Sequence, residues 1–202
     1  MRTISADVNG LLAQYQTQIN ERLEKFFDKK IEEATRISNY TQEVVATAKE
    51  YTLRGGKRLR PIFCICGYKC LSDHNLEAII EASISLELMQ SSLLVHDDIM
   101  DEDELRRGKQ TFHIVYKNLC ERRFGKKKAL KFGENIAIVA GDLLEAYGEE
   151  ALAKSSFKSE YVKKALAKYA EIVKNVGYGQ ILDITAEREG AFNEAEILTI
   201  HK

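Results

Sequence analysis

The sequence of 202 residues contains a single proline and no tryptophan, and it has four cysteines and a formal net charge of −1. Scarce proline, together with plentiful Ala, Leu, Glu and Lys, favours long uninterrupted helices. A net charge near zero provides no overall field that would attract nucleic acid or an anionic membrane. No apolar run approaches the ~18 residues of a membrane span, and the N-terminus lacks the apolar core of a signal peptide. We therefore expect a cytoplasmic protein with no membrane span and no nucleic-acid partner.

The cysteines do not follow a pattern typical of a metal site or a disulfide framework. Cys64 and Cys66 would lie on different faces of a helix, and Cys70 and Cys120 provide no second CxxC pair. Reduced, packed thiols are the simpler interpretation, and they agree with a cytosolic compartment.

Apolar side chains recur at helical spacing along most of the chain, and 45% of all residues are apolar. We find no strand alternation of useful length and no internal repeat. The sequence therefore predicts an all-α fold in one domain, residues 1–202, long enough to bury a core. Helices are expected over residues 11–37, from Asn39 to the stop at Gly55-Gly56, from the turn containing Pro61, from Ser72 or Asp73 to the aspartates described below, over 109–124 and 136–153, from Ser155 or Ser156 past Gly179, and from Asn193.

Three of these helices carry further local signals. Asn39 with Gln42, and Asn193 with Glu196, have the spacing of a capping box. The helix over 136–153 is apolar almost all round, and Gly141 would let a neighbouring helix approach closely. We therefore expect that helix to be buried.

An acidic cluster at the end of the apolar segment before residue 97 is the strongest chemical signal. If this segment is helical, Asp97 and Asp101 are four residues apart and project from the same face, with Asp98 at its edge. Carboxylates at a helix C-terminus oppose the helix dipole, so such a helix end favours a cation. Oxygen ligands on one face, completed by water, suit Mg²⁺ that also holds a substrate phosphate.

A solvated acidic turn is the alternative interpretation of this cluster. An EF-hand is excluded, because the required glycine and the closing Glu are absent at the right spacing. Arg106 and Arg107 follow closely and offer planar donor forks for phosphate. Metal with phosphate is the better interpretation.

A second basic segment lies upstream. Gly55-Gly56 would let the backbone approach an anion closely. Lys57 and Arg60 fall on one face if a helix begins there, although an exposed basic helix start is an equal alternative.

Together these motifs resemble the trans-isoprenyl diphosphate synthases, the family of farnesyl, geranylgeranyl and longer polyprenyl diphosphate synthases. The resemblance runs from about Leu53 onward. It implies an isoprenoid-synthase-type helical bundle around a central cavity, and a homodimer. The motifs that carry it are Asp97-Asp98-x-x-Asp101 with Arg106-Arg107-Gly108, Gly55-Gly56-Lys57-Arg58-Leu59-Arg60-Pro61, Gly141-Asp142, and Gly179-Gln180-Ile181-Leu182-Asp183.

The resemblance also implies roles for individual residues. Asp97 and Asp101 match the Mg²⁺ ligands of the family, and Asp98 matches a supporting residue. Arg106 matches a contact to the allylic diphosphate substrate. Lys57, Arg60, Gln90 and Arg107 match contacts to isopentenyl diphosphate.

The implied reaction is electrophilic chain elongation by a magnesium-dependent prenyltransferase. Mg²⁺ and arginines stabilise the departing diphosphate, the allylic C–O bond ionises, and the double bond of isopentenyl diphosphate attacks the cation. No protein nucleophile is required. His96 and His113 could act as bases, but a structural role is the preferred interpretation.

Product length follows from helix geometry. The growing chain should run away from the aspartates past Ser92 and Leu93, then Met89 and Leu88, then Ser85. Short-chain enzymes of the family place a bulky aromatic at the position of Ser92 or Leu93. Because Ser92 is small, we expect geranylgeranyl or a longer product.

Members of the family carry, further along, a Lys-Thr pair and a second aspartate-rich motif, and this sequence has neither. We therefore expect the sequence, which stops at Lys202, to cover only part of such a protein. Two other functions stay open, a class I terpene cyclase and a non-catalytic subunit of a heteromeric synthase. Lys57, Arg60 and Gln90 argue against the cyclase, because a cyclase needs no isopentenyl diphosphate site.

Overall fold

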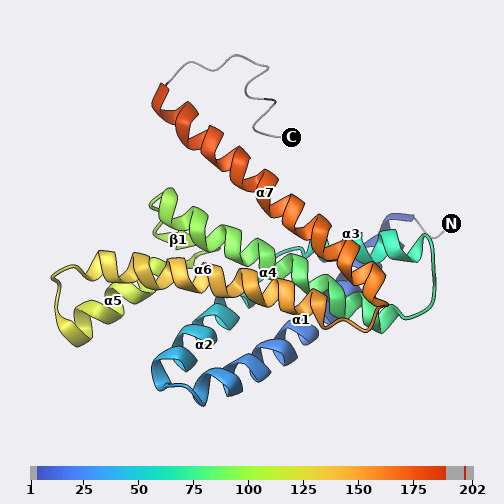
Figure 1. The fold of residues 1–202 in the computed structure, drawn as a ribbon, viewed down its shortest axis with the longest axis horizontal. Coiled ribbons are helices and arrows are strands. Elements are labelled where there is room, and N and C mark those ends of the chain that lie inside the picture. Colours follow the sequence, from blue (N-terminus) through green and yellow to red (C-terminus); the bar gives the residue numbers. More distant parts are fainter. Residues whose placement is uncertain (1–3, 190–197, 199–202) are drawn as a thin grey trace. The chain divides into compact units, whose positions relative to one another are not determined.

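The computed structural model describes residues 4–189 and residue 198, and the all-α prediction is confirmed for them (Figure 1). The chain divides into two compact units, Met1–Ser156 and Phe157–Lys202, so the single domain stays a prediction. The first unit contains α1 (Ile4–Thr35), α2 (Asn39–Leu53), α3 (Leu59–Lys69), α4 (Leu76–Met100), a hairpin of β1 (Leu105–Arg106) and β2 (Lys109–Gln110), α5 (Phe112–Phe124) and α6 (Ala129–Ala153). The described part of the second unit is α7 (Ser159–Glu189), with residue 198.

Several helix boundaries differ from the sequence prediction. The capping box of α2 begins one residue early, because Ser38 accepts a hydrogen bond from the Thr41 amide and the Thr41 hydroxyl accepts one from the Ser38 amide. Asn75 lies in the left-handed region with φ of 58° immediately before α4, so α4 begins after the predicted Ser72 or Asp73. Likewise α6 begins earlier and α7 later than predicted. The predicted helix start at Asn193 and Glu196 lies outside the described residues.

Helix α4 forms the centre of the first unit and packs against α6, α3 and α1. In Figure 1, α4 and α6 run side by side. By length and composition α4 could cross a membrane, in contrast to the prediction that no apolar run is long enough. However, 67% of its apolar window is buried inside the fold, as in the core helix of a globular domain.

Close helix packing at Gly141 agrees with the prediction. A Cβ at this position would collide with the imidazole of His96, so only glycine lets α4 and α6 approach this closely. The prediction that α6 is buried all round is wrong, because Ile138 is 41% and Val139 is 55% exposed. Helix α6 buries one face against α4 and α5, and composition alone could not indicate that the opposite face stays open.

Candidate active site

The predicted carboxylate pair lies at the C-terminal end of α4. The Asp101 amide donates to the Asp97 carbonyl at 2.8 Å, so the last turn continues to Asp101 and places the two residues one turn apart. Asp97 is half-buried and Asp101 is exposed. Burial and the negative charge of Asp101 raise the pKa of Asp97, although the Arg106 guanidinium opposes this. A cation between the two carboxylates would relieve this repulsion.

The donor set fits magnesium in part. Within residues 4–189 and 198, no cluster of three or more His, Cys, Asp or Glu side chains has the geometry of a metal site. Two carboxylates are nevertheless hard oxygen ligands of the kind Mg²⁺ prefers, and Mg²⁺ usually keeps waters and phosphate oxygens as its other ligands. Asp97 and Asp101 would therefore hold Mg²⁺ only together with a bound phosphate and water.

Asp98 lies in a different environment from its two neighbours. Its side chain is fully buried. The hydroxyl of Tyr51, on α2, donates to Asp98 Oδ2 at 2.6 Å, and Arg106 Nε donates to Asp98 Oδ1 at 2.6 Å. Burial and this hydrogen bond raise the pKa of Tyr51 far above its ordinary value, so its hydroxyl stays a donor. Asp98 thus holds Arg106 in place.

Arg106 is held by three carboxylates along one edge of its guanidinium. Besides Asp98, its Nη2 atom lies 3.3 Å from Asp97 and 3.1 Å from Asp103. Burial lowers the pKa of Arg106, but the hydrogen bond and charge of Asp98 outweigh burial and raise it, so the side chain stays charged. Among the described residues Nη1 has no hydrogen-bond partner, which leaves it available to an anion.

Arg107 is presented by a tight hairpin turn. Arg107 and Gly108 both have positive φ, 55° and 76°, and they join β1 and β2 as the two-residue loop of a type I′ turn. The Arg107 guanidinium donates to the Gly55 carbonyl, and a Cβ added at Gly56 would lie 3.1 Å from its Nη2 atom. The two glycines therefore give room to Arg107, and this contact brings Arg107 beside the segment that carries Lys57.

Lys57 and Arg60 do not share a helical face, in contrast to the sequence prediction. Helix α3 begins at Leu59, because Arg58 precedes it in the left-handed region with φ of 52°. Lys57 thus lies in the connecting loop and Arg60 in the first turn of α3, and both are exposed.

Arg58 is a residue that sequence reasoning missed. It is 2% exposed and pairs with the buried Glu87 of α4, and it also donates to Asn20 Oδ1 and to the Thr52 carbonyl, each at 2.9 Å. It therefore fixes the loop before α3 against α1, α2 and α4. Glu87 could have indicated this role in the sequence, because a glutamate inside an apolar helix requires a positively charged or hydrogen-bonding partner.

The predicted residues along α4 differ in exposure. Ser92 and Met89 are buried, as are Leu88 and Ser85 behind them. Leu93 and Gln90 are half-buried.

Half-buried side chains recur on α4 at Leu86, Gln90, Leu93 and Asp97, which are four, three and four residues apart and share one face. This partly open face of α4, residues 86, 90, 93 and 97, leads from the aspartates toward the start of the helix. Leu86 was not predicted, because periodicity alone does not indicate which apolar residues lie on an open face.

His96 and His113, the two histidines considered as possible bases, both contact residues of a neighbouring helix. His96 Nε2 lies 3.1 Å from the Ile138 carbonyl and its ring packs against Gly141. His113 is buried, and burial lowers its pKa. Neither side chain is hydrogen-bonded to the arginines or aspartates of the site.

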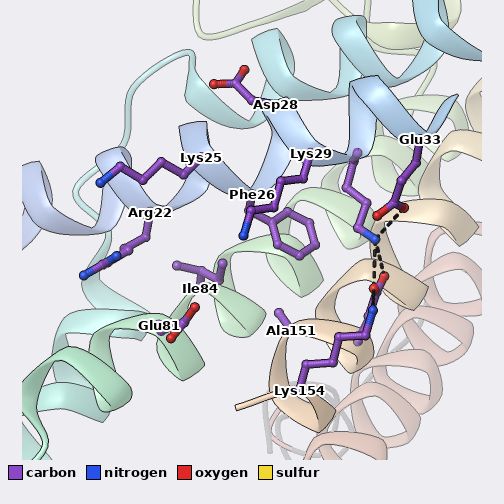
Figure 2. Close-up of a pocket in the computed structure, with 12 residues that line it drawn as sticks. Arg22, Lys25, Phe26, Asp28, Lys29, Glu33, Glu81, Ile84, Ala151 and Lys154 are labelled. Carbon is purple, nitrogen blue, oxygen red and sulfur yellow. Dashed lines mark hydrogen bonds and ion pairs between the residues drawn. The ribbon is translucent and has the colours of Figure 1, made fainter. Parts of the chain in front are cut away.

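A cavity of about 560 Å³ lies between α1, α4 and the end of α6, and none of the predicted site residues lines it (Figure 2). Lys30, which is 5% exposed, is held there between Glu33 and Glu150. Basic and acidic side chains both line this cavity, and Figure 2 shows labelled residues of both kinds around it. Lys30, Glu33, Glu150 and Lys154 pair with one another at one end of this cavity. Because the predicted aspartates and arginines lie elsewhere, we place the candidate site at the aspartate end of α4.

Comparisons with known proteins show what this chain is similar to. The family described as polyprenyl synthetase matches residues 42–202. A geranylgeranyl pyrophosphate synthase from Geoglobus acetivorans is 34% identical over 174 residues, which are 86% of this chain and 49% of that protein. A short chain isoprenyl diphosphate synthase from Methanocaldococcus jannaschii is 34% identical over 84% of this chain and 43% of its own length.

Solved structures are similar in fold. A geranylgeranyl pyrophosphate synthase from Corynebacterium glutamicum, complexed with isoprenyl diphosphate and magnesium, superposes with a TM-score of 0.85 at 27% identity, over 94% of this chain and 54% of that one. The structure of the Geoglobus acetivorans enzyme gives a TM-score of 0.77 at 29% identity, over 94% and 54%. The chain therefore spans about half the length of the relatives that it matches.

Proposed function

This chain belongs to the polyprenyl synthetase family, the trans-isoprenyl diphosphate synthases, and from this premise we propose that the protein elongates an allylic diphosphate with isopentenyl diphosphate. The observation that carries the proposal is the meeting of two separate basic groups beside the aspartates. Arg106 lies among the carboxylates of Asp97 and Asp98, while Arg107 lies on the Gly55-Gly56 loop. Two adjacent diphosphate sites are what a condensation of two diphosphates requires.

Each basic group has a distinct task in this proposal. Arg106, with Nη1 available, binds the allylic diphosphate and stabilises the negative charge that builds as the C–O bond breaks. Arg107, Lys57 and Arg60 bind the diphosphate of isopentenyl diphosphate and bring its double bond to the allylic carbon. Mg²⁺ held by Asp97 and Asp101 would supply further positive charge to the leaving diphosphate. A carbon–carbon bond then forms and a proton leaves.

The partly open face of α4 would receive the growing chain. Leu93 and Leu86 lie on this face below the aspartates, and neither is aromatic. We therefore propose geranylgeranyl or a longer product. Replacing the small Ser92 with Phe should shorten the product, although Ser92 is 2% exposed and the added ring should also cost about 1–3 kcal/mol of stability.

A homodimer and a cytoplasmic location complete the proposal. The exposed Ile138 and Val139 on α6 support a dimer, because a second copy would cover apolar surface that the first unit leaves open. The four cysteines are free in the structure, which supports a reducing compartment. The burial of α4 within the fold supports a protein without a membrane span.

The test uses the purified protein. It is incubated with radiolabelled isopentenyl diphosphate and an allylic diphosphate primer, with Mg²⁺ or with a chelator. We expect label in a longer prenyl diphosphate only when Mg²⁺ is present. Hydrocarbon released from the allylic diphosphate alone would instead identify a class I terpene cyclase. Activity that appears only after a second, different subunit is added would identify a heteromeric synthase.

A further inference from the structure

Tyr51 connects the two halves of the candidate site. It stands near the end of α2, which stops at Leu53, immediately before the loop that carries Gly55, Gly56 and Lys57. Its side chain is 3% exposed, and its hydroxyl reaches Asp98 on α4. A tyrosine from the isopentenyl diphosphate side of the site thus hydrogen-bonds the aspartate on the allylic side.

We propose that Tyr51 is a positioning residue for the allylic diphosphate, acting through Asp98 on Arg106. This inference rests on the proposed condensation reaction. Tyr51 itself is too deeply buried to contact a substrate. Its role is to hold the Asp98 carboxylate in one orientation, so that Arg106 presents its Nη1 atom to the diphosphate.

The hydrogen bonds around Asp98 explain why one hydroxyl matters. Tyr51 occupies Oδ2 and Arg106 occupies Oδ1, so both oxygens of a fully buried carboxylate have a donor. Without the hydroxyl, Oδ2 would be unsatisfied in a site that water does not reach, which is costly for a charged group. The Asp98 carboxylate would then rotate so that both of its oxygens approach the Arg106 guanidinium, and the guanidinium would turn with it.

The surroundings of the Tyr51 ring make a clean test possible. Its ring packs edge-on against Phe112 at 6.1 Å between centroids, and the Arg54 guanidinium lies 5.0 Å from the ring centroid. These contacts keep a phenylalanine ring in the same place. Tyr51→Phe should therefore remove the hydroxyl and little else.

Tyr116 provides a matched control. It is also 3% exposed and stacks on the same Phe112 at 5.4 Å, but its hydroxyl lies 3.3 Å from the Thr47 hydroxyl and reaches none of the carboxylates. Tyr116→Phe therefore removes one buried hydroxyl without touching the Asp98 network.

The experiment uses the purified protein. It measures the KM for each substrate and the affinity for an unreactive thiolodiphosphate analogue of the allylic substrate. Tyr51→Phe should raise the allylic KM and the analogue Kd about tenfold, which corresponds to about 1.4 kcal/mol. The KM for isopentenyl diphosphate should stay unchanged, and Tyr116→Phe should change neither constant. Equal rises in both KM values, or values equal to those of Tyr116→Phe, would overturn the inference.

A double-mutant cycle distinguishes action through Arg106 from a general weakening of the fold by Tyr51→Phe. Arg106→Lys keeps the charge but removes the planar fork that Asp98 orients. If Tyr51 acts through Arg106, adding Tyr51→Phe to Arg106→Lys should raise the analogue Kd no further. Independent effects that multiply would refute the inference. Absence of condensation by the wild-type protein would refute the proposed function, whereas wild-type activity with a silent Tyr51→Phe variant would refute the positioning role alone.

Discussion

Removing Glu87 should destabilise the protein far more than removing another glutamate of the same helix. The Glu87 side chain is 7% exposed and pairs with the fully buried guanidinium of Arg58. Glu87→Ala would leave that guanidinium charged, buried and without a carboxylate. Breaking a buried ion pair from one side typically costs about 3–5 kcal/mol, because the remaining charge is uncompensated.

The structure indicates the lower end of that range. Arg58 would keep two acceptors, the Asn20 side chain and the Thr52 carbonyl. We therefore expect a loss of about 3 kcal/mol in the free energy of unfolding. At about 2–4 °C per kcal/mol for a chain of this size, Tm should fall by about 6–12 °C.

Glu77→Ala is the matched control for this measurement. Glu77 also lies on α4 and also pairs with an arginine, Arg22, but its side chain is 71% exposed. An exposed pair of this kind is worth about 0–1 kcal/mol. Urea unfolding followed by circular dichroism measures both variants. A Glu87→Ala variant no less stable than Glu77→Ala would refute the reasoning that the Arg58 loop depends on this pair.

Three further predictions follow from the same structure. Leu93→Phe places a ring on the partly open face of α4 and should shorten the product by at least one isoprene unit, and an unchanged product profile in mass spectrometry would contradict this. Gly141→Ala should lower the free energy of unfolding by about 1–3 kcal/mol, because the added Cβ meets the imidazole of His96 on α4. Gly67→Ala in α3, where a Cβ meets open space, should leave the free energy of unfolding unchanged or raise it by up to ~1 kcal/mol. Similar unfolding curves for the two variants would refute the packing argument. Burial raises the pKa of Glu150, but hydrogen bonds from Lys154 and Lys30 outweigh burial and lower it, so ionised Glu150 stabilises the fold above its ordinary pKa of about 4.5. This stabilisation is lost as pH falls through the lowered pKa of the folded state. Glu150→Gln should therefore make Tm less sensitive to acid below pH 4.5, and an unaltered acid dependence of Tm would count against the ion pair.

Local features of the fold were predictable because they depend on near neighbours in the chain. The 3.6-residue apolar period indicated the helices, and Gly55-Gly56 marked the end of α2. Helix starts were less predictable. Asn75 precedes α4 in a left-handed conformation that no short-range pattern required, and the capping hydroxyl of α2 came from Ser38, adjacent to the residue expected.

The sequence by itself determined the pair of carboxylates, since Asp97 and Asp101 need only one helical turn to share a face. It also contains the two basic segments, one of which offers arginine forks for phosphate, while diphosphate is what the resemblance implies. Tertiary structure alone decided what each charge contacts. It buried Arg58 against Glu87 while leaving Lys57 and Arg60 exposed, and it brought Tyr51 to Asp98 from a helix distant in sequence. Burial and long-range hydrogen bonds arise from helix packing, which local spacing does not encode. They separate the charges that hold this site together from the charges that stay exposed.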